Sequence, residues 1–359
     1  PSTPPVPSRM PPVAFVPPPT GYTIRHLVSH AERAEVVRIQ DETWGSGFTE
    51  RIPAAMLLVG PKLGGITGGA FDASGRMVGF VFGLTGPRDG TLAHWSDMLA
   101  VRPEAQGRRL GEALKHWQRA ECRRMGVEVM YWTFDPFVAR NAHLNLNLLG
   151  AGVHQFVPDM YGTETASPVH GPLGTDRFVA SWSVRAEPVA LPGDPTLIAG
   201  ALVVAGPPGH GPTEGDALPD APRVAVRIPT DYHHLLRHDL EGARVWRMAA
   251  RRAFSHYLTR GYRVTAFVPD RTADPTSSGF HSAVLTNGEM AAFYNGVAFL
   301  AAFAMVPIAR RIGAAPLHAL SLIAAGIGMV CLPHVTSKAL LFLPAVGIGL
   351  GWASIMGNP

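Results

Sequence analysis

A strand, a turn of small and basic residues, and a helix follow one another between Trp95 and Leu114. The apolar residues from Trp95 to Val101 predict a buried strand, and the periodic apolar residues from Gly107 to Met125 predict a helix. The first N–H groups of a helix have no intrahelical acceptor, and the helix dipole adds partial positive charge where they point. This stretch therefore predicts an anion-binding turn.

Strands and one helix are predicted before this turn. Tyr22 to Leu27 is the first strand, and Ser29 or His30 caps a helix through Thr43. Gly68 to Phe71 and Met77 to Leu84 predict a hairpin, because the five residues between them, Asp72 to Arg76, have turn chemistry. The two hairpin strands and the strand from Trp95 to Val101 are therefore three antiparallel strands expected to precede the helix that begins at Gly107.

A further strand and a short helix are predicted after it. Val127 to Phe134 alternates β-forming residues and ends at Asp135-Pro136, and Arg140 to Ala151 predicts a short helix that glycine stops. Gln106, Gly107 and Gly111, with the strings Trp132-Thr133-Phe134-Asp135-Pro136, Arg140-Asn141-Ala142 and Leu149-Gly150-Ala151, resemble the GNAT N-acetyltransferases. The resemblance covers residues 20 to 270 and implies an α/β fold: a mixed, mostly antiparallel central sheet flanked by helices, with a C-terminal extension.

The resemblance also implies an acyl donor, acetyl-CoA, as co-substrate. Its pantetheine arm would pair with the backbone of the strand that carries Met98, Leu99 and Val101. Its pyrophosphate would meet the turn formed by Gln106, Gly107, Arg108, Arg109, Leu110 and Gly111. Arg109 stands where the family pattern has glycine.

The chemistry implied is attack of an amine on the thioester, which requires a base and an acid for the thiolate. Asp97 is the candidate base, with a solvated strand-edge aspartate as the equal alternative. Leu146 stands where family members commonly have a tyrosine acid, so Tyr161, or Asn141 as a hydrogen-bond donor, are the candidate substitutes.

Three further residues are candidates for binding the acceptor. Asp135 could bind the amine, although an Asp-Pro pair more often only makes a turn. Arg140 could hold a carboxylate or phosphate, or be a solvated surface residue. Trp44 could line the acceptor pocket, although an aromatic residue at a helix end usually packs in the core.

Composition excludes some classes of function. A formal net charge of +4 and scattered arginines, without interleaved aromatic residues, argue against nucleic-acid binding. Cys122 and Cys331 lie far apart, and the histidines and cysteines show no ligand spacing, so neither a disulfide framework nor a metal is predicted.

The sequence predicts four regions. Residues 1–20 are a disordered, Pro-rich arm, 21–184 the GNAT domain, and 185–270 its C-terminal extension. Residues 271–359 hold three apolar segments, Met290 to Ala309, Pro316 to Leu332 and Ala339 to Met356. Each is long enough to cross a bilayer core, and a buried helical hairpin is the alternative. We therefore expect possible membrane association only through 290–356.

Residues 275–359 resemble part of a sugar-type major facilitator transporter. The resemblance rests on Asn287 to Gly296, on Arg310-Arg311-Ile312-Gly313 and on Gly347 to Pro359. Only about three of that fold's twelve helices are present, so no alternating-access path can be assembled. By the positive-inside rule, Arg310 and Arg311 would place the preceding acetyltransferase region outside the cell, where acetyl-CoA is absent. A transporter fragment joined by gene fusion, frameshift or assembly error is the favoured hypothesis.

The leading hypothesis is a cytoplasmic N-acyltransferase acting on a small-molecule or peptide amine, with membrane association only if the C-terminal segment is expressed. The alternatives are an acyl-CoA-binding module without turnover, suggested by Arg109 and Leu146, and a membrane protein whose activity belongs to the transporter-like tail.

Overall fold

The computed structural model describes residues 17–162, 173–186, 189–198, 201–205, 217–270, 280–288 and residue 323. These residues belong to two compact units. The first contains the chain through Asp135 together with Leu144–Ala190, and the second contains Pro136–His143 and the chain from Leu191.

The first unit begins with β1 (Tyr22–His26) and α1 (His30–Trp44), close to the predicted bounds. Ser29 caps α1: its Oγ accepts from the N–H of Glu32 at 3.1 Å, and the Glu32 carboxylate accepts from the N–H of Ser29 at 3.3 Å. This reciprocal capping box fixes the start of the helix. Gly45, with a φ of +88°, ends it.

A seven-stranded sheet forms the centre of the first unit. The remaining strands are β2 (Ile66–Asp72), β3 (Met77–Arg88), β4 (Thr91–Val101), β5 (Val129–Phe134), β6 (Gly152–Val157) and β7 (Arg177–Ser183). Their order is β1-β2-β3-β4-β5-β7-β6, and every neighbouring pair is antiparallel except β4 and β5. The prediction of a mixed, mostly antiparallel sheet is therefore confirmed.

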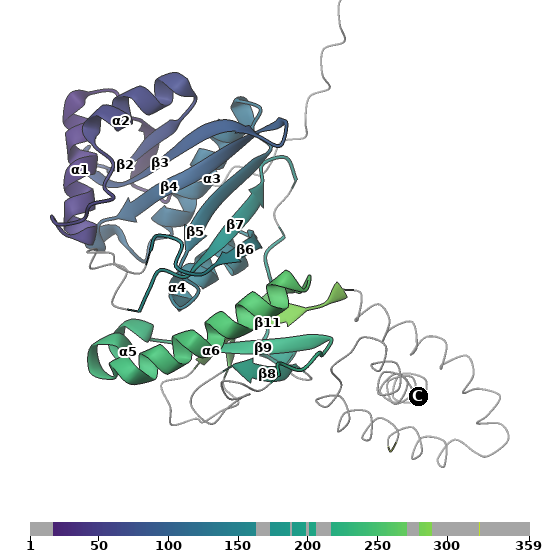
Figure 1. Cartoon of the computed structure of the whole chain (residues 1–359). Coiled ribbons are helices and arrows are strands. Elements are labelled where there is room, and N and C mark those ends of the chain that lie inside the picture. Colours follow the sequence, from purple (N-terminus) through teal and green to yellow (C-terminus); the bar gives the residue numbers. More distant parts are fainter. Residues whose placement is uncertain are drawn as a thin grey trace, which may run out of the picture. The chain divides into compact units, whose positions relative to one another are not determined.

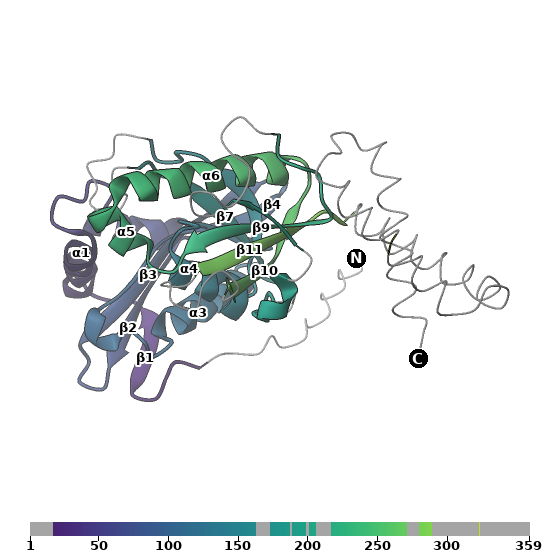
Figure 2. The same cartoon turned by 90° about the horizontal axis from the view of Figure 1, so that it is seen from below.

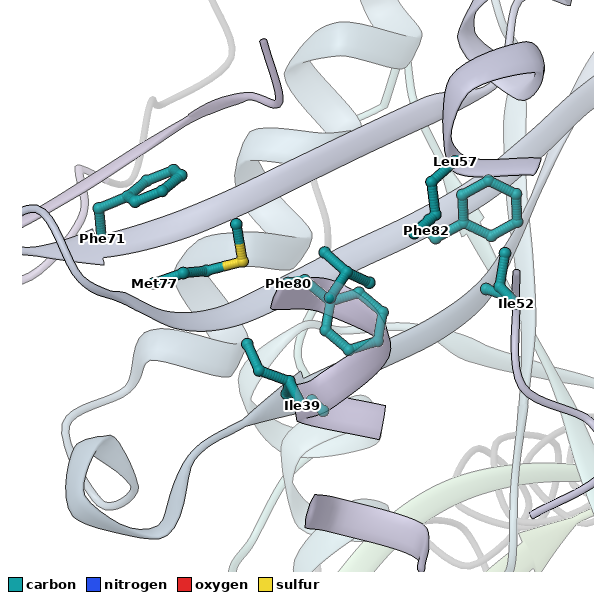
Figure 3. Close-up of a cluster of buried hydrophobic side chains, with 9 residues drawn as sticks. Ile39, Ile52, Leu57, Phe71, Met77, Phe80 and Phe82 are labelled. Carbon is teal, nitrogen blue, oxygen red and sulfur yellow. The ribbon is translucent and has the colours of Figure 1, made fainter. Parts of the chain in front are cut away.

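Helices cover both faces of this sheet, as Figures 1 and 2 show. On one side lie α1, α2 (Ala54–Val59) and the short 3₁₀ helix η1 (Gly60–Leu63), and on the other lies α3 (Leu110–Arg124). Two further short helices are η2 (Pro103–Ala105), which precedes α3, and the π-helix η3 (His143–Leu148). Strand alternation divides the core between the two faces. Phe80 and Phe82 of β3 pack against Ile39 and Leu57 on the α1 and α2 side (Figure 3), whereas Val81 packs with Leu110 and Leu114 of α3. Each such side chain stabilises the fold by about 1.5–3 kcal/mol.

The second unit contains a four-stranded sheet of order β10-β11-β9-β8. Its elements are α4 (Ala139–Ala142), η4 (Pro195–Ile198), β8 (Leu202–Ala205), β9 (Arg223–Pro229), α5 (Tyr232–His238), α6 (Leu240–Thr259), β10 (Arg263–Asp270) and β11 (Phe280–Thr286). Strand β11 pairs with both β9 and β10, so this sheet continues past residue 270, where the sequence placed the end of the extension. The helix expected from Thr230 or Asp231 is broken at Asp239, whose carboxylate accepts from the N–H of Gly242 and caps α6.

The three apolar segments predicted between residues 290 and 356 lie outside the described residues, apart from residue 323. Among the helices that the structure describes, none is both long and apolar enough to cross a membrane. The Pro-rich arm is also outside the described residues, except for its last four positions.

Candidate active site

The parallel pairing of β4 with β5 is short. It joins Ala93 to Val129, His94 to Met130 and Trp95 to Tyr131, and both strands then continue without pairing to each other. We call this divergence, between 96–101 of β4 and 132–134 of β5, the β4–β5 fork. It leaves backbone groups of two central strands without each other as partners, which is unusual inside a sheet.

Asp97 lies at the fork in a bulge of β4. Met98 pairs with Phe82 and Ser96 with Gly83, so Asp97 is the extra residue between them. Its side chain is exposed, and within the described chain it has no hydrogen bond or ion pair. Neighbouring protein atoms still remove enough water to raise the pKa of its carboxyl, and the charge of Glu50 raises it further. A carboxylate with a raised pKa and no partner is suited to accept a proton.

Tyr161 lies at the β5 side of the fork. Its Oη is 2.8 Å from Oγ1 of Thr133, the second residue of β5 beyond the last pair with β4. Tyr161 is 39% exposed, but neighbouring protein atoms remove enough water from its hydroxyl to raise the pKa; the charges of Asp97 and Glu50 add to this, whereas the Thr133 hydrogen bond and Arg177 oppose it. The hydroxyl therefore stays protonated at neutral pH, within electrostatic reach of Asp97.

A second set of contacts holds Tyr161 in place. Its N–H donates to Oγ1 of Thr175 at 2.8 Å, and the guanidinium carbon of Arg177 lies 5.5 Å from the centre of its ring. Nη1 of Arg177 is 3.6 Å from Oδ2 of Asp135. The predicted amine contact Asp135 is therefore an ion-pair partner of Arg177.

The turn before α3 has a left-handed backbone at two positions. Gly107 has a φ of +74° and Arg109 a φ of +59°. The predicted helix start at Gly107 is therefore wrong by three residues, because α3 begins at Leu110 only after these left-handed residues. The GNAT pattern that this stretch resembles has glycine at the Arg109 position, where glycine has no Cβ penalty. Here Arg109 adopts that conformation, and its guanidinium donates twice, at 2.7 Å, to Glu112.

The N–H groups of Gly107 to Gly111 have no backbone acceptor within the part of the chain that the structure describes. Gln106 differs from them: its N–H donates to the carbonyl of Pro103 at 3.2 Å, and its side-chain amide donates to the carbonyl of Val101 at 2.9 Å. Gln106 therefore shapes the turn, and the free donors begin at Gly107. Arg108 is exposed beside them.

Arg102 ties the end of β4 to α1. Its guanidinium donates to both carboxylate oxygens of Glu42 at 2.7 and 2.8 Å, lies 2.6 Å from Glu35, and donates to the carbonyl of Met77 at 2.6 Å. These partners raise the pKa of Arg102, which therefore remains charged although its side chain is only 5% exposed. The turn thus starts from a fixed residue.

The side chains of the fork strand belong to the two cores. Met98 packs on the α1 side, and Leu99 and Val101 pack on the α3 side. Trp44 is also a core residue: its ring centroid lies 5.3 Å from that of Phe48 and 6.3 Å from that of Phe80. This packing matches the alternative given for Trp44. Because the side chains of Met98, Leu99 and Val101 pack in the two cores, the backbone of the fork strand is the part that can meet a ligand.

Arg140 and Asn141 lie on α4, which belongs to the second unit. Arg140 is exposed and Asn141 half-buried, and neither side chain has a hydrogen bond or ion pair with the rest of the described chain. Their roles stay predictions. Leu146, for which the resemblance predicted a tyrosine, is fully buried.

Sequence reasoning missed Thr133, Glu50 and Arg177. Thr133 could have been found, since alternation along Val129–Phe134 places it between the buried Trp132 and Phe134. Glu50 comes from a segment without a motif. Asp176-Arg177 is one of the strings that resemble GNAT proteins, but only the fold brings the charge of Arg177 to Tyr161 and that of Glu50 to Asp97. Across the described ranges, no group of three histidine, cysteine or acidic residues could hold a metal ion.

No family model and no curated protein matches the chain. Several solved structures similar to part of it are acetyltransferases. A putative acetyltransferase from Salmonella typhimurium with acetyl-CoA is 22% identical. The match covers 48% of this chain and 99% of the acetyltransferase chain, with a TM-score of 0.36. A phosphinothricin acetyltransferase from Sinorhizobium meliloti in complex with AcCoA is 18% identical over 47% of this chain and 94% of its own, with a TM-score of 0.38. The ribosomal-protein-S18-alanine N-acetyltransferase from Escherichia coli is 16% identical over 46% and 95%, with a TM-score of 0.36.

Proposed function

We propose that the first unit is an acyl-CoA-dependent N-acetyltransferase that moves an acetyl group from acetyl-CoA to an amine of a small molecule or peptide. The observation that carries this proposal is the β4–β5 fork, with Asp97 on one strand, the Tyr161–Thr133 pair on the other, and the donor-rich turn after Val101. A candidate base, a candidate acid and a candidate anion site therefore lie at the fork or directly after it.

The reaction would use these groups as follows. The amine nitrogen attacks the thioester carbonyl carbon, so that a C–N bond forms and the C–S bond breaks. Asp97 takes the proton that the amine loses, and the Tyr161 hydroxyl gives a proton to the departing thiolate. The raised pKa values of Asp97 and Tyr161 suit these two directions of transfer.

Binding of acetyl-CoA would depend mainly on the backbone. The exposed edge of β4 at Met98, Leu99 and Val101 would pair with the pantetheine arm, as a strand pairs with a strand. The N–H groups of 107–111 and the start of α3 would receive the pyrophosphate. Arg109 supplies a cation there that Glu112 partly neutralises, and Arg108 supplies an exposed one.

Calorimetric titration of acetyl-CoA into the full chain tests this proposal. A Cβ at Gly111 would lie 3.6 Å from Leu99, so Gly111→Trp fills the space between the turn and β4. Gly86→Trp is the matched control, because a Cβ there meets nothing within 4 Å. We expect acetyl-CoA to bind to the wild type and to the control but not to Gly111→Trp.

Release of free CoA thiol with a panel of amines then tests turnover. Amine-dependent release supports the enzyme, whereas binding without release with every amine would favour the acyl-CoA-binding module. A folded wild-type chain that does not bind acetyl-CoA would contradict both. Acceptor contacts by Trp44, Asp135 and Arg140 remain part of the proposal, to be tested once an acceptor is found, and Asn141 remains the alternative hydrogen-bond donor to the thiolate.

A further inference from the structure

A chain of buried polar side chains lies between β4 and α3, next to the fork. Nζ of Lys115 is 2.7 Å from Oγ of Ser96, which is 2.7 Å from Oε1 of Gln118. Nε2 of Gln118 is 2.9 Å from Nε2 of His94, and Nδ1 of His94 is 2.8 Å from Oγ1 of Thr85. The four residues from Lys115 to His94 are buried.

The chemistry of the donors fixes the direction of each hydrogen bond in this series. A protonated lysine can only donate, so Ser96 accepts from Lys115 and donates to Gln118. The amide of Gln118 then donates to Nε2 of His94, which leaves His94 with its proton on Nδ1 and Thr85 as its acceptor. This assignment requires a neutral His94, and burial together with the charge of Lys115 lowers the pKa of His94 to about 3.

Lys115 occupies a particular place relative to the fork. Trp95 and Tyr131 form the last pair between the two strands, and the next residues are Ser96 on β4 and Trp132 on β5. Lys115 contacts both: besides its hydrogen bond to Ser96, its Nζ lies 4.0 Å from the centre of the Trp132 ring. One side chain therefore joins the two strands at the point where their backbone pairing ends.

Packing alone does not account for a lysine at this position. Its side chain is buried, and burial lowers the pKa of the amine to about 7. The titratable groups that face it are His94 from β4 and Cys122 from its own helix, and no carboxylate pairs with it among the described residues. An apolar side chain of equal length would avoid this desolvation cost. Only the contacts to Ser96 and Trp132 require the amine.

We infer that Lys115 is a positioning residue that fixes β4 against β5 at the fork and so holds the strand edge on which the acyl donor lies. The inference rests on the proposed function for the ligand, and on the contacts of Lys115 alone for the bridge between the strands. It adds a residue of α3 that touches neither substrate nor cofactor.

Two variants of Lys115 separate the bridge from simple filling of space. Lys115→Met keeps the length but cannot donate to Ser96, whereas Lys115→Arg keeps a donor and a cation that can stack on Trp132. Arg119→Met is the matched control: Arg119 is also a buried cation of α3, but its guanidinium carbon lies 4.8 Å from the centre of Trp182 on β7, and its Nε donates to the carbonyl of Ser183 on the same strand at 3.0 Å.

We expect Lys115→Met to weaken CoA binding to the full chain about tenfold and to speed amide exchange in peptides covering 96–101 by a similar factor. Lys115→Arg should restore both values to within about threefold, and Arg119→Met should change neither by more than about twofold, although it lowers the Tm. Unchanged exchange in 96–101 of Lys115→Met, or equal effects in Lys115→Met and Arg119→Met, would overturn the inference.

If Lys115→Met does not fold, Ser96→Ala removes the same hydrogen bond from the β4 side and is expected to give the same two changes. If the wild type does not bind CoA, the proposed function fails, but amide exchange still decides whether Lys115 bridges the strands.

Discussion

Each of the two sheets contains one parallel pair of strands, and the two pairs end differently. In the first unit β4 and β5 share three residue pairs, and both strands then continue. In the second unit β8 and β9 also share three pairs, but β8 has only four residues and lies at the sheet edge. Two parallel strands diverge within a sheet only where both continue beyond their last shared residue pair. This occurs between central strands of the first unit.

In each unit, a helix that packs on the sheet carries a buried cationic side chain. Lys115 of α3 contacts Ser96 and Trp132 at the fork. In the second unit Nε of Arg247, on α6, donates to the hydroxyl of Tyr232 at 3.0 Å, and its guanidinium carbon lies 5.0 Å from the centre of Phe137. The first cation joins two diverging strands, and the second is enclosed by aromatic rings. The comparison predicts that changes at the fork alter ligand binding and turnover, whereas changes at Arg247 alter stability alone.

The largest effect is expected for Asp97→Asn. Amine-dependent CoA release should fall about 10²–10⁴-fold, because the amide cannot accept the amine proton. Acetyl-CoA affinity should hold, since the donor is bound by backbone groups. In the wild type the rate should rise with pH through the raised pKa of Asp97, because only the ionised carboxylate is a base. The pH–rate profiles of both proteins check this, and a rise that persists in Asp97→Asn would assign the base elsewhere.

A smaller loss is expected for Tyr161→Phe. Turnover should fall by about 10²-fold, at the lower end of the range for general acids, because the thiolate then leaves without a proton donor. In the wild type the rate should fall at alkaline pH, but only above the ordinary tyrosine range, because the folded-state pKa is raised. Thr133→Val is the matched control, since it keeps the hydroxyl and removes only its partner. Equal rates in Tyr161→Phe and the wild type would exclude Tyr161 as the acid.

Gly83→Ala tests the β3 side of the fork. A Cβ at Gly83 would lie 2.3 Å from Nε2 of His94 and 2.6 Å from the carbonyl oxygen of Trp95, so β4 or His94 must shift. We expect a loss of about 1–3 kcal/mol in the free energy of unfolding and weaker acetyl-CoA binding. Gly86→Ala, on the same strand with nothing within 4 Å of its Cβ, should stay within about 0.5 kcal/mol. Denaturant unfolding of both variants measures the difference, and similar values would show that β4 does not depend on this close approach.

Elements with a local signal could be predicted from the sequence. Ser29 or His30 was predicted to cap α1, and Ser29 does; alternation from Val127 to Phe134 predicted β5, which begins two residues later at Val129. The turn before α3 was predicted as a feature but not its length, because a left-handed Arg109 has no sequence signature. Strand β11 was missed altogether, because one of its two partner strands, β9, lies about 50 residues earlier in the chain.

The candidate site likewise contains residues with a local sequence signal and residues that only the fold brings together. Asp97 and the turn lie in one continuous stretch that carries the motif, and their placement could be predicted. Tyr161 was named only as a substitute acid, and its contact with Thr133, 28 residues away, comes from the fold. Lys115 and Gln118 are polar residues on the buried face of α3, three positions apart. That spacing was a signal, but the partners that explain it, His94 and Ser96, lie on a different element.

The smallest effect is expected in how the free energy of unfolding depends on pH, where the two buried cations Lys115 and Arg247 should differ. The pKa of Lys115 is about 7 in the folded chain and about 10.4 when unfolded. Between these values the unfolded chain binds more protons, so stability should rise as pH increases above 7, by at most about 1.4 kcal/mol per pH unit. Below the folded pKa both states are protonated and this contribution to the slope vanishes.

Lys115→Met should remove this part of the slope, whereas Arg247→Met should lower stability about equally at every pH, because an arginine side chain does not deprotonate in this range. Urea unfolding at pH 7, 8 and 9 measures both variants against the wild type, and the differences cancel every titrating group that the three proteins share. A slope that survives in Lys115→Met would mean that Lys115 reaches water in the folded chain, and the bridge between β4 and β5 would then lack its buried amine. A slope also lost in Arg247→Met would mean that its loss is not specific to Lys115, which would contradict the assignment of this proton uptake to the buried amine.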